Sequence, residues 1–311
     1  MKKILLVLMS LLVLFTRCKK NDEEFVDDSN TLVPVRLEIP LNGSRTSFSS
    51  LFPNGNIKWG NKNKVECIYL ATPCAYSYYS MKEEKLKYLG LLFEMRADVE
   101  EYTDKIVFYG QVYKGSMVNL EYCTAYYFGN NGDAPQGSNV TDITTKMVDI
   151  HLTGKKISFD KQTGNIDDLG DYHLAKANVK VYKRKTVNNL YLYDLEMESF
   201  TTMNSIAMLD LKGETKLEGS AAKLKSYTIE WMVEENVFRE TYEYDTLGYI
   251  DVSNNVGDRS FISLLPTEDS VSLECGKGRY DFYKGISSNK VYVGKYGNTL
   301  DDLMPLEWST P

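Results

Sequence analysis

The sequence predicts an all-β protein, folded as β-sandwiches or as a barrel, and three observations support this. Apolar and polar residues alternate with a period of two in many short stretches. Tyr, Val, Ile, Phe and Thr, which strands favour, are frequent in these stretches. Turn-forming groups such as "PNGN", "KQTGN" and "NNVGD" separate the stretches from one another.

The alternation locates individual strands and the side of each strand that faces a core. Residues 36–41 carry three apolar side chains on one face, and residues 227–233 carry four. The same pattern occurs in residues 178–183, 271–275 and 290–296. The side chains predicted to point inward include Leu37, Ile39, Leu41, Tyr227, Ile229, Trp231, Val233, Val291 and Val293.

One stretch, residues 80–95, has a helical pattern. Gly90 interrupts it, and its second half reads equally well as a strand. Both interpretations stay open at the level of sequence.

The first residues predict an export signal that ends in a lipid anchor. Lys2 and Lys3 precede an apolar run, residues 4–15, which is shorter than the roughly 20 residues of a membrane-spanning helix. Cys18 follows directly, and the residues before it resemble a bacterial lipobox in which Phe15 and Arg17 replace the usual residues. We expect cleavage after residue 17 and attachment of acyl chains such as palmitate at Cys18. The alternative is an ordinary signal peptide with a bystander cysteine.

Composition then divides the mature chain into a tether and two domains. Residues 18–32 are acidic and poor in apolar groups, which predicts a flexible tether. Its start, "CKKNDEE", resembles the signal that sends some lipoproteins to the outer face of the outer membrane. A polar, turn-rich stretch at 129–171 precedes a fresh series of strands. We therefore expect one β-sandwich domain at 33–170 and a second at 171–311.

Net charge excludes some classes of partner. The full chain carries −7, and removal of Lys2, Lys3 and Arg17 takes away three positive charges, which leaves about −10. An acidic chain without a basic stripe is a poor ligand for nucleic acid. Anionic lipid should repel it as well, so we expect contact with the membrane through the lipid anchor only.

Four cysteines remain after the predicted lipidation site: Cys67, Cys74, Cys123 and Cys275. An exported protein can pair them in three ways. Cys67 and Cys74 are the favoured disulfide, as neighbours across a predicted hairpin. Cys67 and Cys275 also alternate with apolar neighbours, as small core residues do. The scattered cysteines do not predict a zinc site.

No motif predicts catalysis, a cofactor or a metal. His151 and His173 are the two histidines, and each is expected to have a structural role on a strand or loop. Neither a nucleophile elbow nor an HExxH sequence occurs. Adjacent acids on a strand point apart, unlike the facing carboxylates of a glycosidase. The acid pairs are Asp167–Asp168, Glu234–Glu235 and Asp301–Asp302.

Tyrosine is abundant, with 23 residues, and it clusters at 76–79, 122–128 and 191–194. Cross-strand stacking in a sheet accounts for such clusters. The alternative is a platform of rings that binds sugars.

Several of these segments together resemble the fimbrillin-like (Mfa-like) surface lipoproteins of Gram-negative anaerobes. The resemblance covers the lipid signal with its acidic tether and "VRLEIPL" followed by "SRTSF" and "IKWGNKNKVECIYLA". It continues with "FTTMNSIAMLDLKGE" and "DRSFISLLPTEDSVSLECGKGRYDFYKGI". Asn61 stands where the family usually has an acid.

The resemblance implies two transthyretin-like β-sandwiches in tandem that assemble by strand donation. In that family an arginine-specific protease can release the first strand, and another subunit's terminal strand fills the groove. The matching arginine here is Arg36, with Arg45 as the second candidate; the alternative for Arg36 is an outward charge on an edge strand. The tail 297–311 is either a donor strand or packed on its own domain.

The expected function is therefore a non-enzymatic, lipid-anchored subunit of a fimbrium (pilus) on the outer membrane, as anchor, stalk or tip adhesin. Its expected partners are other fimbrial subunits and a host protein or glycan. The alternative is a glycan-binding surface lipoprotein of a polysaccharide uptake system. A hydrolase whose acids converge only on folding is a third candidate.

Overall fold

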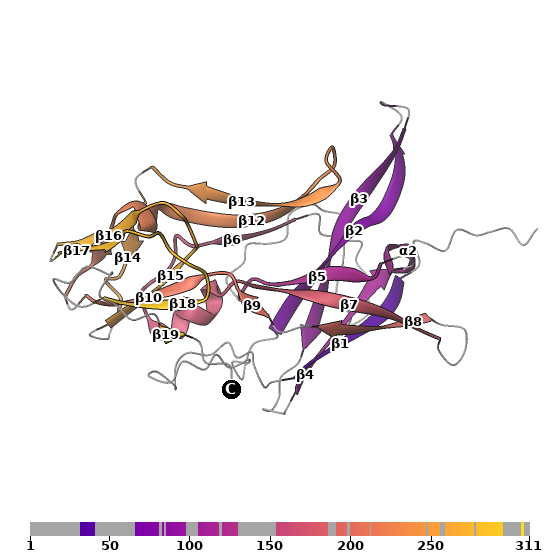
Figure 1. Ribbon diagram of the computed structural model, residues 1–311, viewed down its shortest axis with the longest axis horizontal. Coiled ribbons are helices and arrows are strands. Elements are labelled where there is room, and N and C mark those ends of the chain that lie inside the picture. Colours follow the sequence, from indigo (N-terminus) through magenta and orange to yellow (C-terminus); the bar gives the residue numbers. More distant parts are fainter. Residues whose placement is uncertain are drawn as a thin grey trace, which may run out of the picture.

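A computed structural model gives the fold of the chain. It describes residues 32–40, 66–80, 83, 85–97, 105–117, 120–129, 154–185, 191–197, 200–211, 213–246, 248–255, 259–276, 278–294 and 306–307. Strands make up most of these residues (Figure 1). Helical structure within the described ranges is limited to the four-residue turn α2 (Lys114–Met117) and the 3₁₀ turns η2 (Ile166–Tyr172) and η3 (Ser220–Lys223). The all-β prediction is confirmed.

The largest sheet closes on itself into a barrel-like ring. Its strand order is β5-β2-β3-β4-β1-β8-β7, and β7 pairs back onto β5, from Tyr122 opposite Lys180 to Tyr127 opposite Ala175. The short strand β9 (Thr201–Thr202) adds to β7. The ring strands are β1 (Leu32–Pro40), β2 (Glu66–Ser80), β3 (Lys85–Ala97), β4 (Lys105–Tyr113), β5 (Tyr122–Tyr127), β7 (Ala175–Lys185) and β8 (Tyr191–Met197). Because β5 and β7 pair, the two end strands of the sheet protect each other's edges.

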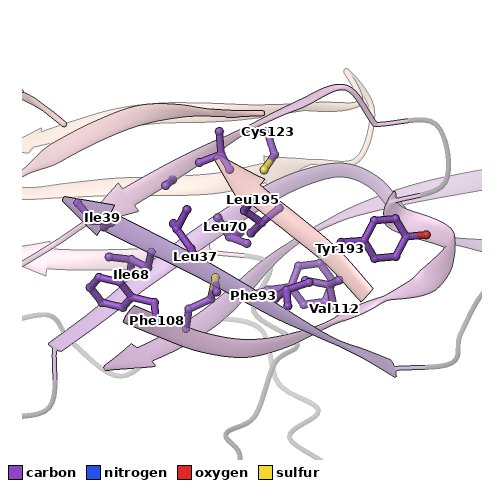
Figure 2. Packing of buried hydrophobic residues seen from close by; sticks show 14 of the residues in the cluster. Leu37, Ile39, Ile68, Leu70, Phe93, Phe108, Val112, Cys123, Tyr193 and Leu195 are labelled. Carbon is purple, nitrogen blue, oxygen red and sulfur yellow. The ribbon is translucent and has the colours of Figure 1, made fainter. Parts of the chain in front are cut away.

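Alternating side chains of these strands fill the interior of the ring. Every second residue points inward, because the side-chain period of a strand is two. The interior is apolar and packed, and Figure 2 shows part of this cluster. Its members include Val33, Val35, Leu37, Ile39, Ile68, Leu70, Phe93, Met95, Phe108, Val112, Cys123, Val179, Tyr193 and Leu195.

A three-stranded sheet covers part of the outer face of the ring. Its order is β13 (Val237–Tyr244), β12 (Leu224–Met232) and β6 (Gly154–Ser158). Tyr69, Leu92 and Tyr126 point outward from the ring and pack with Tyr227 and Ile229 of β12 in a second core. The inward positions predicted for residues 227–233 are thus confirmed at Tyr227, Ile229 and Trp231, which are 0%, 0% and 4% exposed.

The remaining strands form small sheets around a third core. β15 (Arg259–Leu264), β10 (Ser205–Asp210), β18 (Lys290–Gly294) and β19 (Leu306–Glu307) form one sheet. β11 (Lys216–Leu217) pairs with β14 (Ile250–Asp251), and β16 (Val271–Cys275) pairs with β17 (Gly278–Phe282). Leu209, Ile262, Leu273 and Tyr280 lie among the buried residues between these sheets.

A buried polar network joins the third core to the rest of the molecule. The Asn204 side chain donates to the Tyr172 carbonyl (3.2 Å) and to Ser263 Oγ (2.5 Å), and it accepts from the Leu174 amide (3.0 Å). The Gln162 side chain forms two hydrogen bonds with the backbone of Ser263. It donates to the Ser263 carbonyl (3.1 Å) and accepts from the Ser263 amide (2.6 Å). Because a buried polar group that loses its partner costs free energy, this network fixes how the parts are joined.

Three expectations differ from this arrangement. The helical alternative for residues 80–95 is wrong, because β3 runs from Lys85 to Ala97. Two tandem sandwiches are not confirmed, since the first sheet closes into a ring. The hydrogen-bond pattern also does not follow the boundary predicted near residue 170. Strands β7 and β8 return to the ring, and β6 joins β12.

Candidate assembly site: strand β1 and its place in the ring

Strand β1 occupies a central position in the closed sheet. It pairs antiparallel with β4 along all nine of its residues, from Leu32 opposite Tyr113 to Pro40 opposite Lys105. On its other side it pairs in parallel with β8 over three positions, Val35 to Leu37. As the first strand of the described chain, it completes the ring between two strands that come later in the sequence.

The inward face of β1 forms part of the ring core. Val33, Val35, Leu37 and Ile39 are 4%, 2%, 0% and 3% exposed. Leu37 and Ile39 lie with Phe93, Phe108 and Leu195 of neighbouring strands in the same cluster (Figure 2). The predicted inward positions of Leu37 and Ile39 are therefore confirmed.

The outward face of β1 carries Arg36 and Glu38, which form an ion pair. Arg36 stands opposite Tyr109 of β4 and Asp194 of β8. A hydrogen bond with Tyr109, together with the charge of Glu38, raises the pKa of Arg36 above its usual value. Arg36 is thus an outward charge, in a central strand rather than the expected edge strand.

The hairpin expected between Cys67 and Cys74, the residues of the predicted disulfide, is not formed. Both residues belong to the single strand β2, where seven residues of extended chain span roughly 20 Å, and a disulfide needs Cα atoms within about 7 Å. Cys67 forms no disulfide, and its Sγ lies 3.6 Å from Glu94 Oε1. Cys123 is buried in the ring core, which raises the pKa of its thiol to about 12.

His173 has a buried structural position. Its Nε2 is 3.1 Å from Thr202 Oγ1, and its ring packs edge-on against Tyr127 with centroids 5.6 Å apart. Burial lowers the pKa of His173 to about 4.

In the acid pairs, Asp168 accepts from the Thr163 hydroxyl and Glu235 pairs with Arg239. Across the described ranges, the His, Cys, Asp and Glu side chains form no group of three that suits a metal ion.

Among the described side chains, three tyrosines of the ring strands are exposed. Tyr109, Tyr122 and Tyr182 are 50%, 56% and 37% exposed and belong to β4, β5 and β7. Lys180 lies over the Tyr182 ring at 4.9 Å, and the Tyr182 hydroxyl donates to Glu196. Tyr122 stands opposite Lys180 on the adjacent strand, so Lys180 lies near both Tyr122 and Tyr182. The sugar-binding platform stays a prediction.

Several expectations lie outside the described residues. They concern the signal peptide 1–17, most of the tether 18–32, Cys18, Arg45 and His151. Of the C-terminal tail, Leu306–Glu307 is described, and it pairs with β18 of its own chain. In the part of the chain that the structure covers, no helix has the length and apolar character to cross a membrane.

Sequence reasoning did not anticipate the role of β8 in this site. Tyr193 and Leu195 of β8 are 0% and 7% exposed and face the ring core beside β1. Residues 191–194 were interpreted as a tyrosine cluster. The alternation of Tyr191, Tyr193, Leu195 and Met197 is the sequence signal that predicts this strand.

No protein-family model matches the chain, and no curated protein sequence matches it either. Two solved structures are similar over most of their length. One, from Bacteroides ovatus and provisionally assigned to cell adhesion, has a TM-score of 0.35 and 13% identity, over 84% of this chain and 90% of that one. The other, a fimbrial assembly protein from Parabacteroides distasonis, has a TM-score of 0.33 and 11% identity, over 84% of this chain and 89% of that one. TM-scores below 0.5 do not establish a common fold.

Proposed function

We propose that the chain is a surface subunit of a fimbrium, and that subunits join when β1 leaves its ring and a strand of another subunit replaces it. The observation that carries this proposal is the position of β1. A strand at the start of the described chain completes the ring between β4 and β8 and supplies four buried side chains. A terminal strand has one covalent connection to its domain, so it can leave without unthreading the rest of the sheet.

The cost of an empty β1 position makes replacement necessary. Burial of a Val, Leu or Ile side chain contributes about 1.5–3 kcal/mol, so the four inward residues contribute roughly 6–12 kcal/mol. This is similar to the whole free energy of unfolding of a domain, about 5–15 kcal/mol. A ring without β1 would also present two unpaired strand edges, on β4 and β8. A donor strand with alternating apolar residues restores both the core and the hydrogen bonds.

The C-terminal tail is the candidate donor. Met304, Leu306 and Trp308 alternate in the way that the inward face of β1 does. The described contact of the tail with β18 involves two pairs of residues, Lys290 with Glu307 and Val291 with Leu306. Such a short pairing costs little to release compared with the nine-residue pairing of β1 with β4.

Of the two candidate cleavage positions, we favour Arg45. The peptide bond after Arg36 lies within β1, where the strand pairs on both sides and a protease cannot bind it in extended form. A cut after Arg36 would also divide the strand. A cut after Arg45, which follows β1 in the sequence, would leave β1 whole on the released segment.

The anchor completes the proposal. Acyl chains on Cys18 would hold the subunit at the outer membrane, with the acidic residues 19–32 as its tether. Its position in the fimbrium, as anchor or tip adhesin, follows from whether the lipid is retained. The subunit acts through strand exchange and has no catalytic role.

A reversible lock on β1 tests strand exchange. Glu38 stands opposite Val107 of β4, so Glu38→Cys/Val107→Cys should form a cross-strand disulfide that keeps β1 in place and leaves both candidate arginines intact. Purified full-length chain is treated with an arginine-specific protease, and oligomers are measured by native mass spectrometry. We expect oligomers from the unmodified chain, and from the locked variant only after reduction.

The matched control locks a different pair of ring strands. Tyr122→Cys/Lys180→Cys joins β5 to β7 and should leave oligomer formation unchanged. Arg45→Gln should prevent assembly and Arg36→Gln should not. Persistent monomers after complete cleavage of the unmodified chain, or equal assembly of the locked variant before reduction, would refute the proposal.

A further inference from the structure

Among the residues that the structure describes, one edge of strand β13 has no partner strand, and the proposed strand exchange does not use it. β13 pairs with β12 alone in this part of the chain, and it is the uppermost strand in the left-hand part of Figure 1. It is eight residues long, "VFRETYEY", and contains no Pro, Gly or Lys. Val237, Tyr242 and Tyr244 on this strand are 45%, 42% and 57% exposed.

Edge strands of soluble proteins are usually protected from pairing. Short length, proline, bulges and charged side chains, above all lysine, are the common means of protection. β13 carries three charged residues, Arg239, Glu240 and Glu243, so a partner strand has to match these charges. In β13 the bulge of the hairpin is confined to its last pairs, between Leu224 and Ser226 of β12. The edge from Val237 to Glu243 is regular. An edge of this kind can pair with a strand whose charged and apolar residues match its own.

The sequence of β13 selects a second copy of itself as that partner, in one register. In the joined sheet, the inner faces of both copies should lie on the same side. Two identical antiparallel strands meet this condition when one residue stands opposite the same residue of the other copy. A shift of the pairing by one residue would turn one of the two sheets over. A centre at Arg239 opposes two arginines, and a centre at Glu240 or Glu243 opposes two glutamates. A centre at Thr241 places Arg239 opposite Glu243 twice and opposes no like charges. A centre at Tyr242 leaves a shorter overlap.

The Thr241 register also matches side chains on each face. Phe238 and Tyr244 are on the face that packs toward the second core. In this register Phe238 of one copy would stand opposite Tyr244 of the second copy, and Tyr244 opposite Phe238. Aromatic pairs and opposite charges directly across an antiparallel pair are both favourable. On the outer face, Thr241 meets Thr241 of the second copy between the two Arg239–Glu243 pairs.

The contacts that these charged residues make within one copy leave room for the new ones. Arg239 pairs with Glu235, and both side chains are about half exposed. Glu243 accepts from Lys156 (2.9 Å), Ser226 (3.0 Å) and Lys225 (3.4 Å). A guanidinium has five N–H donors and a carboxylate has about four acceptor positions, so each can keep its present partner.

We propose that two copies of the chain form a two-fold symmetric dimer in which their β13 strands pair antiparallel around Thr241. The pairing joins the sheets β13-β12-β6 of the two copies into one continuous sheet. It goes beyond the proposed strand exchange, because β13 belongs to a different sheet from β1 and no strand has to leave its place. The dimer should therefore form from intact, uncleaved chains.

Charge reversal with rescue tests the pairing. Dissociation constants of purified full-length chain are measured by analytical ultracentrifugation in density-matched detergent. Concentrations reach about 200 μM, because an interface made by one strand edge is small. Arg239→Glu or Glu243→Arg alone creates two like-charge pairs and should weaken the dimer about tenfold. The double variant should restore it to within about twofold.

Two control variants separate the pairing from other effects of charge. Glu235→Gln removes the contact of Arg239 within its own copy and should leave the dimer intact. Arg279→Glu reverses another exposed charge, on β17 and outside the proposed interface, and should also have little effect.

Cysteine substitutions test the register itself. At the two-fold centre the Cα atoms of opposed residues are about 4.5–5.5 Å apart, so Thr241→Cys should cross-link two copies under mild oxidation. Arg239→Cys and Glu243→Cys would lie roughly 13 Å from their own counterparts and should not cross-link. Monomeric unmodified chain at the highest concentration, a double variant that fails to restore pairing, or cross-links strongest at residue 239 or 243 would each overturn the proposal.

Discussion

Replacing Gly90 by alanine tests how the three-stranded sheet is attached to the closed ring. Gly90 lies in β3, and a Cβ atom at this position would be 2.2 Å from Cε3 of Trp231 on β12. Ordinary contacts of a Cβ begin near 3.4 Å, so the indole would have to move by about 1 Å. The ring has little freedom, because Trp231 is 4% exposed and packs edge-on against Phe238 at 5.0 Å.

Two effects of opposite sign compete in this variant. Alanine is favoured over glycine in a strand interior by roughly 0.5–1 kcal/mol. Overpacking of a filled core costs about 1–3 kcal/mol. The steric term is larger, so we expect Gly90→Ala to lower the free energy of unfolding by about 1–2 kcal/mol. For a chain of this size the Tm should fall by roughly 1.5–3 °C in a calorimetric scan.

Gly278 supplies the matched control. It lies in β17, and a Cβ there would meet no atom within 4 Å, so Gly278→Ala should be neutral or slightly stabilising. In a Trp231→Leu background the indole is gone, and Gly90→Ala should then show the favourable propensity term alone. If Gly90→Ala raises the Tm of the otherwise unmodified chain, the indole does not pack against Gly90 and the account of this interface fails.

Two further predictions concern buried titratable groups. The pKa of His173 is about 4 in the folded chain and about 6.5 when unfolded, so the unfolded state binds the proton first as pH falls. The free energy of unfolding should therefore drop by about 3 kcal/mol between pH 6.5 and 4 relative to His173→Gln, in urea titrations at each pH; parallel curves would contradict this. Cys123, with its buried thiol and a pKa of about 12, should resist iodoacetamide at pH 8 until the chain unfolds, as read by peptide mass spectrometry. Rapid labelling of native Cys123 would show that the ring opens.

The sequence predicted the strands far better than their partners. Alternation correctly identified the inward residues of β1 and β12, such as Leu37 and Tyr227, because burial on one face of a strand leaves a local pattern. The same pattern does not say which strand lies alongside. Pairing of β5 with β7, more than 40 residues apart, depends on how the whole core closes.

The domain boundary and the disulfide show the same limit. Composition changes near residue 170, yet β7 carries Ala175 and Val179 into the core built by the first five strands. Cys67 and Cys74 read as neighbours across a hairpin because a turn was expected between them, whereas β2 continues through both with an irregularity after Thr72. Gly90 favours a strand over a helix in the sequence of β3. The structure explains the glycine by the Trp231 indole, which leaves no room for a Cβ atom at this position.

For the candidate site, the sequence predicted strand β1 and its inward face, but it did not predict which strands lie beside β1. Arg36 was expected on an edge strand, and it lies between β4 and β8. The parallel neighbour β8 is 158 residues away in the sequence, from Val35 to Tyr193, and a contact of this length has no signature in local composition. The open edge of β13 follows in the same way from what the other strands do.

The orientation of β1 determines how the molecule resists mechanical load. Consider a force at the N-terminal end of β1 that is directed along the strand axis. The nine-residue pairing with β4 is then loaded in shear, so its hydrogen bonds share the force and must break together. A pull at right angles would open the same bonds one after another, like a zipper. A chain held from this end would stay folded under tension that would separate a peripheral hairpin.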